Sequence, residues 1–218
     1  MGDLLNMDAL LPMRPGAKGP EQDSVPSGKA CRTSDHRSSI GINHDLPTEP
    51  FDCGDLPFLI KRDGTWHYRG NPIERKAMVC LFSRLLKRDE TGTFFLETPI
   101  ERGRIEVEDA PFVVIGMQWS GSGRSQRLTF RTNIDQIVTA GREHPLRSPH
   151  DLLTCQQAPY LHLRDGAGHF PIEARLNRAV YYELVALAEP GFHDGKPVLG
   201  VWSNGVHFPL GEIAPLDT

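Results

Sequence analysis

Hydrophobic and polar residues are distributed differently in the two parts of this chain. Residues 1–50 contain no Phe, Trp or Tyr, but they contain six prolines and many Gly and Ser residues. Such a segment cannot bury enough apolar surface to offset the entropy lost on ordering, so we expect residues 1–50 to form a disordered tail. From Phe51 onward, aromatic and β-branched residues recur in short runs between turn signals, which predicts that the ordered region begins there.

A hairpin and a helix are predicted first in the ordered region. The hairpin comprises two strands and a turn pair, at Leu59–Arg62, Thr65–Tyr68 and Asp63-Gly64. For the helix, Asn71 is a suitable cap, Pro72 fits the first helical position, and Glu74 is placed to reach back to the cap. Apolar residues at three- and four-residue spacing between Ala77 and Leu86 continue the helical pattern.

Short strands dominate the remainder of the pattern. Alternation and turn signals predict strands at residues 94–98, 104–108, 111–119, 126–131, 160–164, 169–172, 198–202 and 206–209. A second helix is expected over residues 174–189, ended by Pro190-Gly191. These elements predict an α+β fold.

An internal repeat appears when the sequence is shifted by 102 residues. Arg62-Asp63-Gly64 then aligns with Arg164-Asp165-Gly166, and Lys76-Ala77-Met78 aligns with Arg178-Ala179-Val180. Both copies follow the order hairpin, helix, strand. We therefore predict a duplicated supersecondary unit, with a binding cleft between the two copies.

The domain boundary has two candidate positions. A division near Gly92 gives a first α+β domain over 51–92 and a strand-rich second domain over 93–218. A division near Pro149 would instead separate the repeats evenly. We prefer the first, because the second domain then keeps the central strands.

Composition and charge exclude several classes of protein. The 218 residues include 39% hydrophobic and 24% charged residues, with a net charge of -4, unlike a collagen or a strongly basic nucleic-acid coat. Neither a basic leader segment nor an apolar run of about 18 residues is present, so we expect a cytoplasmic protein. Residues 61–104 nevertheless hold ten Lys or Arg against six Asp or Glu, a basic segment that includes Trp66 and Tyr68 and suggests phosphate and base contacts.

Catalytic and metal-binding motifs are not evident. Two sets of residues have metal-ligand chemistry, namely His144, His150 and Cys155, and Cys31, His36, His44 and Cys53. Nothing in the sequence fixes their side chains together, so we expect no metal and no cofactor. The carboxylates Glu106, Glu108 and Asp109 with His144 could perform acid–base chemistry if they were buried together, or could form an exposed strand edge.

Several longer strings resemble a known bacterial family, the domain of unknown function 1285. The strings are Cys53-Gly54, Arg62-Asp63-Gly64-Thr65-Trp66-His67-Tyr68, Gly70-Asn71-Pro72-Ile73, Ile105-Glu106-Val107-Glu108-Asp109-Ala110-Pro111-Phe112, His144-Pro145-Leu146-Arg147 and Gly200-Val201-Trp202-Ser203-Asn204-Gly205. The resemblance covers about residues 51–210. It implies a duplicated two-domain α+β arrangement, a second domain similar to pleckstrin-homology-like folds, and a ligand at the domain interface with a role in signalling. The resemblance implies no particular activity, because none is established for the family.

The matching positions give a set of candidate ligand-binding residues. They are Asp63, Trp66, Tyr68, Arg75, Glu108, Asp109, Asn133, His144 and Arg147. Our leading hypothesis is a non-enzymatic regulatory protein that binds a small molecule or protein partner between two related units. The alternatives are a nucleic-acid-binding module and a small metal-dependent or acid–base hydrolase. We expect no membrane partner.

Overall fold

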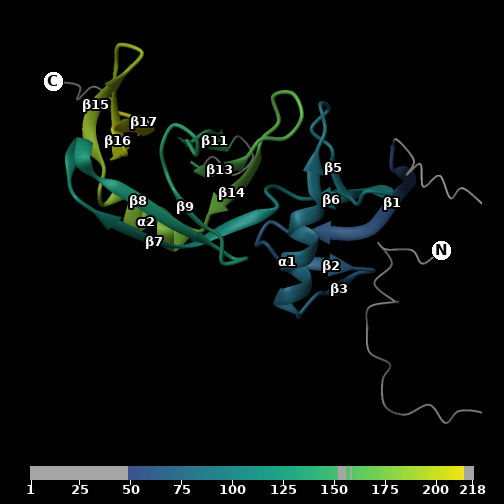
Figure 1. Ribbon diagram of the computed structural model, residues 1–218. Coiled ribbons are helices and arrows are strands. Elements are labelled where there is room, and N and C mark those ends of the chain that lie inside the picture. Colours follow the sequence, from purple (N-terminus) through teal and green to yellow (C-terminus); the bar gives the residue numbers. More distant parts are fainter. Residues whose placement is uncertain (1–48, 152–155, 158, 214–218) are drawn as a thin grey trace, which may run out of the picture.

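The structure is a computed structural model that describes residues 49–151, 156–157 and 159–213. Two groups of strands lie side by side; the first is coloured blue to teal, and the second runs from teal through green to yellow (Figure 1). Except for its last two residues, the predicted tail lies outside the described residues. No helix in the described ranges is long and apolar enough to cross a membrane.

The first half forms a mixed six-stranded sheet in the order β3-β2-β1-β6-β5-β4. Its strands are β1 (Phe51–Ile60), β2 (Trp66–Tyr68), β3 (Asn71–Pro72), β4 (Leu86–Arg88), β5 (Phe94–Glu97) and β6 (Glu101–Val107). β1 and β2 form the predicted hairpin, with Leu59 opposite His67. β1 pairs in parallel with β6, whereas the other pairs are antiparallel.

The first helix, α1 (Lys76–Leu85), begins later than predicted. The sequence signals at Asn71 and Pro72 were expected to start it, but these residues form β3 and pair with β2. Arg75 occupies the cap position without a side-chain hydrogen bond. The expected start was wrong because Asn71 pairs with β2 instead. This pairing provides hydrogen-bond partners for the backbone of Asn71, so the residue does not need to begin a helix.

The second half forms another mixed six-stranded sheet, in the order β10-β13-β14-β7-β8-β9. Its strands are β7 (Phe112–Ser120), β8 (Arg127–Thr132), β9 (Ile137–Thr139), β10 (Leu146–Arg147), β13 (Tyr160–Arg164) and β14 (Ile172–Leu176). The short 3-10 helix η2 (Gly123–Ser125) lies between β7 and β8. β14 pairs in parallel with β7, so this sheet also joins segments that are distant in sequence.

Two smaller sheets and the second helix complete the described fold. The two-stranded sheet contains β11 (His150–Asp151) and β12 (Gln156–Gln157), and the three-stranded sheet contains β15 (Glu189–His193), β16 (Lys196–Ser203) and β17 (Val206–Glu212). The β15–β16 hairpin extends away from the rest of the molecule (Figure 1). The helix α2 (Arg178–Val185) is shorter than the predicted range of 174–189. Residues at both ends of that range belong to strands β14 and β15, so the predicted bounds were wrong.

The predicted repeat agrees with some features of the fold and not with others. α1 and α2 begin at Lys76 and Arg178, 102 residues apart, as the alignment of the two copies requires. The strands that follow them differ, because β5 pairs with β6 in the first six-stranded sheet, whereas β16 lies in the separate three-stranded sheet. Sheets dominate over two short helices in the described residues, so α+β is only a loose description. Duplication and likeness to a pleckstrin-homology fold stay predictions.

The first sheet includes strands from both sides of the predicted boundary at residue 92. β5 and β6 follow that boundary, yet they pair within the same sheet as β1. A cut at 92 would therefore leave β1 without its parallel partner. We propose a division near Ala110, between β6 and β7, in place of 92.

A single asparagine connects the hairpin turn of the first half to the second sheet. The Asn133 side-chain amide donates to the Gly64 carbonyl at 3.0 Å, and its carbonyl accepts from the Val113 amide at 3.2 Å. Gly64 has a φ of +82°, and a Cβ there would lie 2.7 Å from the Asn133 side-chain nitrogen. This turn therefore needs glycine both for its backbone conformation and for its close approach to Asn133.

We predict that Asn133→Ala lowers the free energy of unfolding by about 1–3 kcal/mol, because it leaves two backbone groups at the junction without partners. Urea denaturation monitored by circular dichroism measures the change. The control is Asn71→Ala, because the exposed Asn71 side chain makes only a 3.4 Å contact with the nearby Arg69 carbonyl. Equal stability of the two variants would contradict a connecting role for Asn133.

Candidate functional site

A cleft of about 650 Å³ lies where the two halves of the chain meet. The first half contributes Arg62 and Asp63, from the turn that follows β1. The second half contributes apolar residues of β7. It also contributes residues from the end of β14 and the start of α2, namely Arg175, Arg178, Tyr181 and Tyr182. Cationic side chains from both halves and aromatic side chains from the second half therefore share one cavity.

Local hydrogen bonds fix the first-half wall of this cleft. The Arg62 amide donates to Glu108 Oε2 at 2.8 Å, and the Asp63 carboxylate accepts from the Thr65 amide at 2.9 Å. The side-chain and backbone hydrogen bonds of Thr65 lower the pKa of Asp63. This turn therefore presents an arginine and an ionised carboxylate in a defined arrangement.

The second-half wall depends on the start of α2. Asn177 caps the helix, because its side-chain oxygen accepts from the Val180 amide at 2.8 Å. Arg175, the second-last residue of β14, and Arg178, the first residue of α2, therefore flank a capped helix start. Tyr181 and Tyr182 follow on the first turns, and their rings lie 6.2 Å apart.

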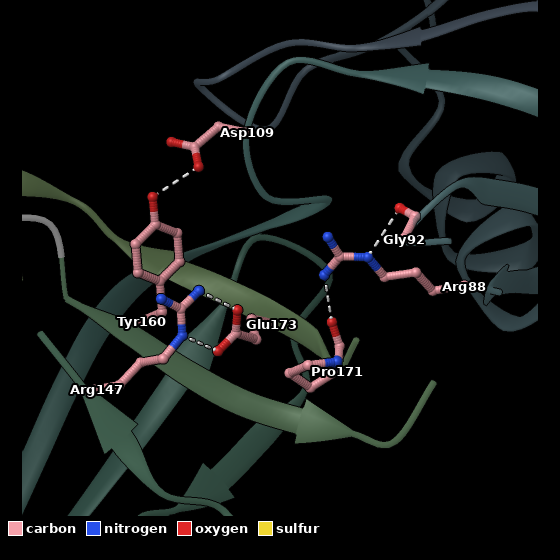
Figure 2. A network of polar contacts seen from close by, with 7 residues as sticks. All are labelled: Arg88, Gly92, Asp109, Arg147, Tyr160, Pro171 and Glu173. Carbon is pink, nitrogen blue, oxygen red and sulfur yellow. Dashed lines mark hydrogen bonds and ion pairs between the residues drawn. The ribbon is translucent and has the colours of Figure 1, made fainter. Parts of the chain in front are cut away.

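Asp109 lies between the two walls, in the segment that links β6 to β7. Its Oδ2 is 3.1 Å from an Arg175 terminal nitrogen and 3.4 Å from Arg62 Nε. These contacts are ion pairs without well-aligned hydrogen bonds. Its Oδ1 accepts a 2.7 Å hydrogen bond from the Tyr160 hydroxyl (Figure 2). One carboxylate, 12% exposed, thus joins an arginine of the first half to two residues of the second.

Burial and the neighbouring carboxylate change the acidity of Tyr160. Its phenol is partly buried and donates to Asp109, and these two effects raise the pKa of Tyr160 to about 12. The tyrosine ring in turn lies against Arg147, whose guanidinium carbon is 4.4 Å from the ring centroid. The phenol is therefore neutral at physiological pH and acts as a hydrogen-bond donor.

Arg147 and Glu173 extend the polar network across β10 and β14 (Figure 2). Both Glu173 oxygens accept from the Arg147 guanidinium, which is the bidentate geometry that arginine favours with carboxylates. The hydrogen bonds to Glu173 raise the pKa of Arg147. Because the Glu173 side chain is only 7% exposed, this pair compensates a charge that would otherwise be costly to bury.

The structure brings five of the nine predicted site residues to the junction or its polar network. Asp63 lines the cleft, Glu108 holds the Arg62 backbone, and Asn133 holds the turn. Asp109 accepts from the Tyr160 hydroxyl, and Arg147 lies over the Tyr160 ring.

The other four predicted residues lie elsewhere. Trp66 and Tyr68 belong to the hydrophobic core, where their side chains are 1% and 9% exposed. Arg75 precedes α1, and His144 contacts the His162 carbonyl at 3.2 Å. None of these four is among the residues that line the cleft.

The predicted chemistry of carboxylates and histidines has limited support. Glu106 and Glu108 are exposed, and no contact in the described residues joins His144 to either of them or to Asp109. No group of three metal-ligating side chains occurs within the described part of the chain. Cys31, His36, His44 and Cys155 lie outside the described residues, and nothing structural follows for them.

Sequence reasoning missed most of the residues that form the site. They are Arg62, Tyr160, Glu173, Arg175, Arg178, Tyr181 and Tyr182. Arg175 lies within the range 174–189 that was predicted as a helix, and Glu173 lies directly before that range. The alternation of buried Ile172, Ala174 and Leu176 with these charged residues is the strand signal that could have placed them on one polar face.

We predict that Tyr160→Phe destabilises the fold by about 1 kcal/mol near neutral pH, a low value because the hydrogen bond is partly exposed to solvent. An unfolded tyrosine has a pKa of about 10. Because folding raises the pKa of Tyr160 to about 12, its contribution is complete below the unfolded value and is lost as the pH rises through the folded value.

Urea denaturation across this pH range provides the measurement. The difference in unfolding free energy between wild type and Tyr160→Phe is expected to shrink at high pH. Tyr182→Phe serves as the control, because the Tyr182 side chain is 63% exposed. A difference that stays constant with pH would contradict the proposed role of the Tyr160 proton.

Comparisons with known proteins cover almost all of the described chain. Family models for the N-terminal and C-terminal domains of proteins of unknown function DUF1285 match residues 47–110 and 111–210. No match was found among curated proteins.

Two solved structures are similar to this chain. The crystal structure of a DUF1285 family protein from Silicibacter pomeroyi DSS-3 has 43% sequence identity and a TM-score of 0.69, with 78% of this chain and 87% of that chain covered. A DUF1285 family protein from Shewanella baltica OS155 has 25% identity and a TM-score of 0.45, with 60% and 91% covered. The two family models meet between Ala110 and Pro111, directly after the carboxylate that joins both walls of the cleft. The chain therefore belongs to the DUF1285 family and contains both of its domains.

Proposed function

We propose that this protein binds a small aromatic carboxylate in the cleft at the junction of its two domains, and that binding serves a regulatory role. The observation that carries the proposal is the convergence of Arg62, Arg175 and Arg178 with two tyrosines in one cavity of about 650 Å³. Cavities of this volume accommodate organic ligands of metabolite or drug size.

The side chains of the cleft favour a carboxylate. Three arginines line it, but Asp63 is the only carboxylate among its lining residues, and Asp109 neutralises the charge shared by Arg62 and Arg175. Arginine pairs with a carboxylate through two parallel hydrogen bonds. The guanidinium groups that line the cavity would therefore provide suitable donors for an organic carboxylate.

The remaining surface of the cleft favours a flat, apolar ligand body. Tyr181, Tyr182 and Ile115 line it together with Val113 and Pro159. Tyrosine rings pack against other rings in offset or edge-to-face arrangements, while their hydroxyl groups remain available to solvent or ligand. An aromatic ring attached to the carboxylate would use this surface.

A regulatory role is supported by the position of the cleft between the two family domains. A ligand that contacts both walls stabilises the arrangement of the domains in which those walls face each other. The same ligand would have no such effect if it contacted only one domain. The absence of a joined set of carboxylates and histidine in the described residues also favours binding over hydrolysis.

The nucleic-acid alternative has less support. Trp66 and Tyr68, which were expected to stack bases, are core residues. Lys76 and Arg104 of the basic segment pair with Asp135 and Asp55, which reduces the positive charge available to phosphates.

We predict that a panel of aromatic carboxylates, with benzoate as its simplest member, raises the melting temperature of the full chain more than acetate does. A ligand that binds only the folded state stabilises it by mass action. For the best member of the panel, Arg178→Gln and Tyr182→Ala should each weaken binding about tenfold or more, because a charged hydrogen bond or a stacked ring contributes about 1.4 kcal/mol or more.

Isothermal titration calorimetry measures these affinities. Arg127→Gln is the matched control, since Arg127 is an exposed arginine on β8 that does not line the cleft. The proposal fails if no panel member stabilises the protein beyond acetate, or if Arg127→Gln weakens binding as much as Arg178→Gln.

A further inference from the structure

A second cleft, of about 460 Å³, lies beside the edge strand β4. Its wall in the first domain includes Lys87 and Arg88 of β4 and Arg102 of β6, and its wall in the second domain includes Arg164 and the turn after β13. None of these residues belongs to the cleft described above. Four cationic side chains from both domains therefore line a separate cavity.

Close ion pairs do not compensate these four cations, although Asp89 attracts Arg102 and Glu173 attracts Arg88 at longer range. Within the described ranges, none of them forms an ion pair with an Asp or Glu side chain. Arg88 donates to the Gly92 and Pro171 carbonyls through Nε and one terminal nitrogen (Figure 2). Arg164 donates to the Ser83 and Leu86 carbonyls. Carbonyl oxygens orient these guanidinium groups, but they do not neutralise them.

Arg102 provides the clearest sign of an unfilled interaction. Its guanidinium carbon lies 4.0 Å from the centroid of the Phe95 ring, which fixes its position. Its Nε is buried and has no hydrogen-bond partner among the described residues. A buried donor of a charged group is costly when it is unpaired, so this nitrogen indicates that a partner is missing.

The acidic residues that line the same cleft are mostly engaged with other groups. Asp89 accepts hydrogen bonds from Thr91 and Thr93, and Asp165 pairs with His162. Glu97 is the remaining carboxylate, and it stands opposite Arg102 on the neighbouring strand without an ion pair. The four cations therefore exceed the three carboxylates that line the cleft by one.

Burial increases the cost of this uncompensated charge. Desolvation lowers the pKa of Arg164 and is the main cause of the lowered pKa of Arg88. Both arginines stay protonated, and an anion in the cleft would stabilise their charges beyond what the carbonyl oxygens provide. Guanidinium and ammonium groups together favour the oxygens of a phosphate, since arginine supplies paired donors and lysine a compact charge.

We propose that the cleft beside β4 is a second binding site, which takes a phosphate group held by Lys87, Arg88, Arg102 and Arg164. The group is either free phosphate or the phosphoryl group of a larger molecule. The site differs from the carboxylate cleft in its residues and in the chemistry of its ligand, so either can exist without the other.

Calorimetric titration of the full chain with inorganic phosphate, at constant ionic strength in chloride buffer, tests this site. We expect saturable binding that Arg102→Gln and Lys87→Gln each weaken at least fivefold. Lys87→Gln alters only an exposed side chain, so it keeps the test valid if Arg102→Gln perturbs folding.

Titration with AMP distinguishes the two possible ligands of this site. Tighter binding of AMP than of phosphate identifies the ligand as the phosphoryl group of a larger molecule, whereas weaker or equal binding identifies it as the free ion.

Two control variants locate the effect. Arg104→Gln removes an exposed arginine from the same strand as Arg102, where it pairs with Asp55 outside the cleft, and it should leave phosphate binding unchanged. Arg178→Gln, which alters the carboxylate cleft, should also leave phosphate binding unchanged. The proposal is overturned if phosphate gives no saturable heat, or if Lys87→Gln and Arg102→Gln bind phosphate as tightly as wild type.

Discussion

The arrangement of this protein depends on one carboxylate in the segment between its two sheets. Asp109 is largely shielded from solvent, and it contacts Arg62 of the first domain together with Arg175 and Tyr160 of the second. Removal of one partner from a shielded ion pair is strongly destabilising, because the remaining charge stays away from water. The contacts of Asp109 therefore restrict how the two domains can meet, and they hold one arginine in each wall of the cleft.

Other contacts reinforce the same junction from different directions. Asn133 holds the hairpin turn against β7, and Arg88 crosses to the carbonyl of Pro171. Arg164 donates to the carbonyls of Ser83, in the last turn of α1, and of Leu86, directly after it, where a positive charge is favoured by the helix dipole. The interface is thus rich in polar and charged groups, which can pair with a ligand that carries the opposite charge.

Sequence patterns located the strands and turns better than they located the site. The Asp63-Gly64 turn and its two strands follow from local chemistry, and the structure confirms them. The start of α1 does not follow from local chemistry, because pairing of Asn71 with β2 overrides a good capping sequence. The site residues come from segments as far apart as Arg62 and Arg178. The parallel pairing of β14 with β7, together with the contacts of Asn133 and Asp109 across the junction, places them together. Periodicity cannot predict such pairing between distant strands, although the alternation around Glu173 does indicate a polar strand face.

Hydrogen–deuterium exchange of the full chain, with and without a saturating aromatic carboxylate, tests the central claim most directly, namely that one ligand contacts both domains in the cleft. The account predicts slower amide exchange in two separate segments, residues 61–65 and 175–182, which form the opposite walls. Slower exchange in only one of these segments, or only in residues remote from the cleft, would contradict it.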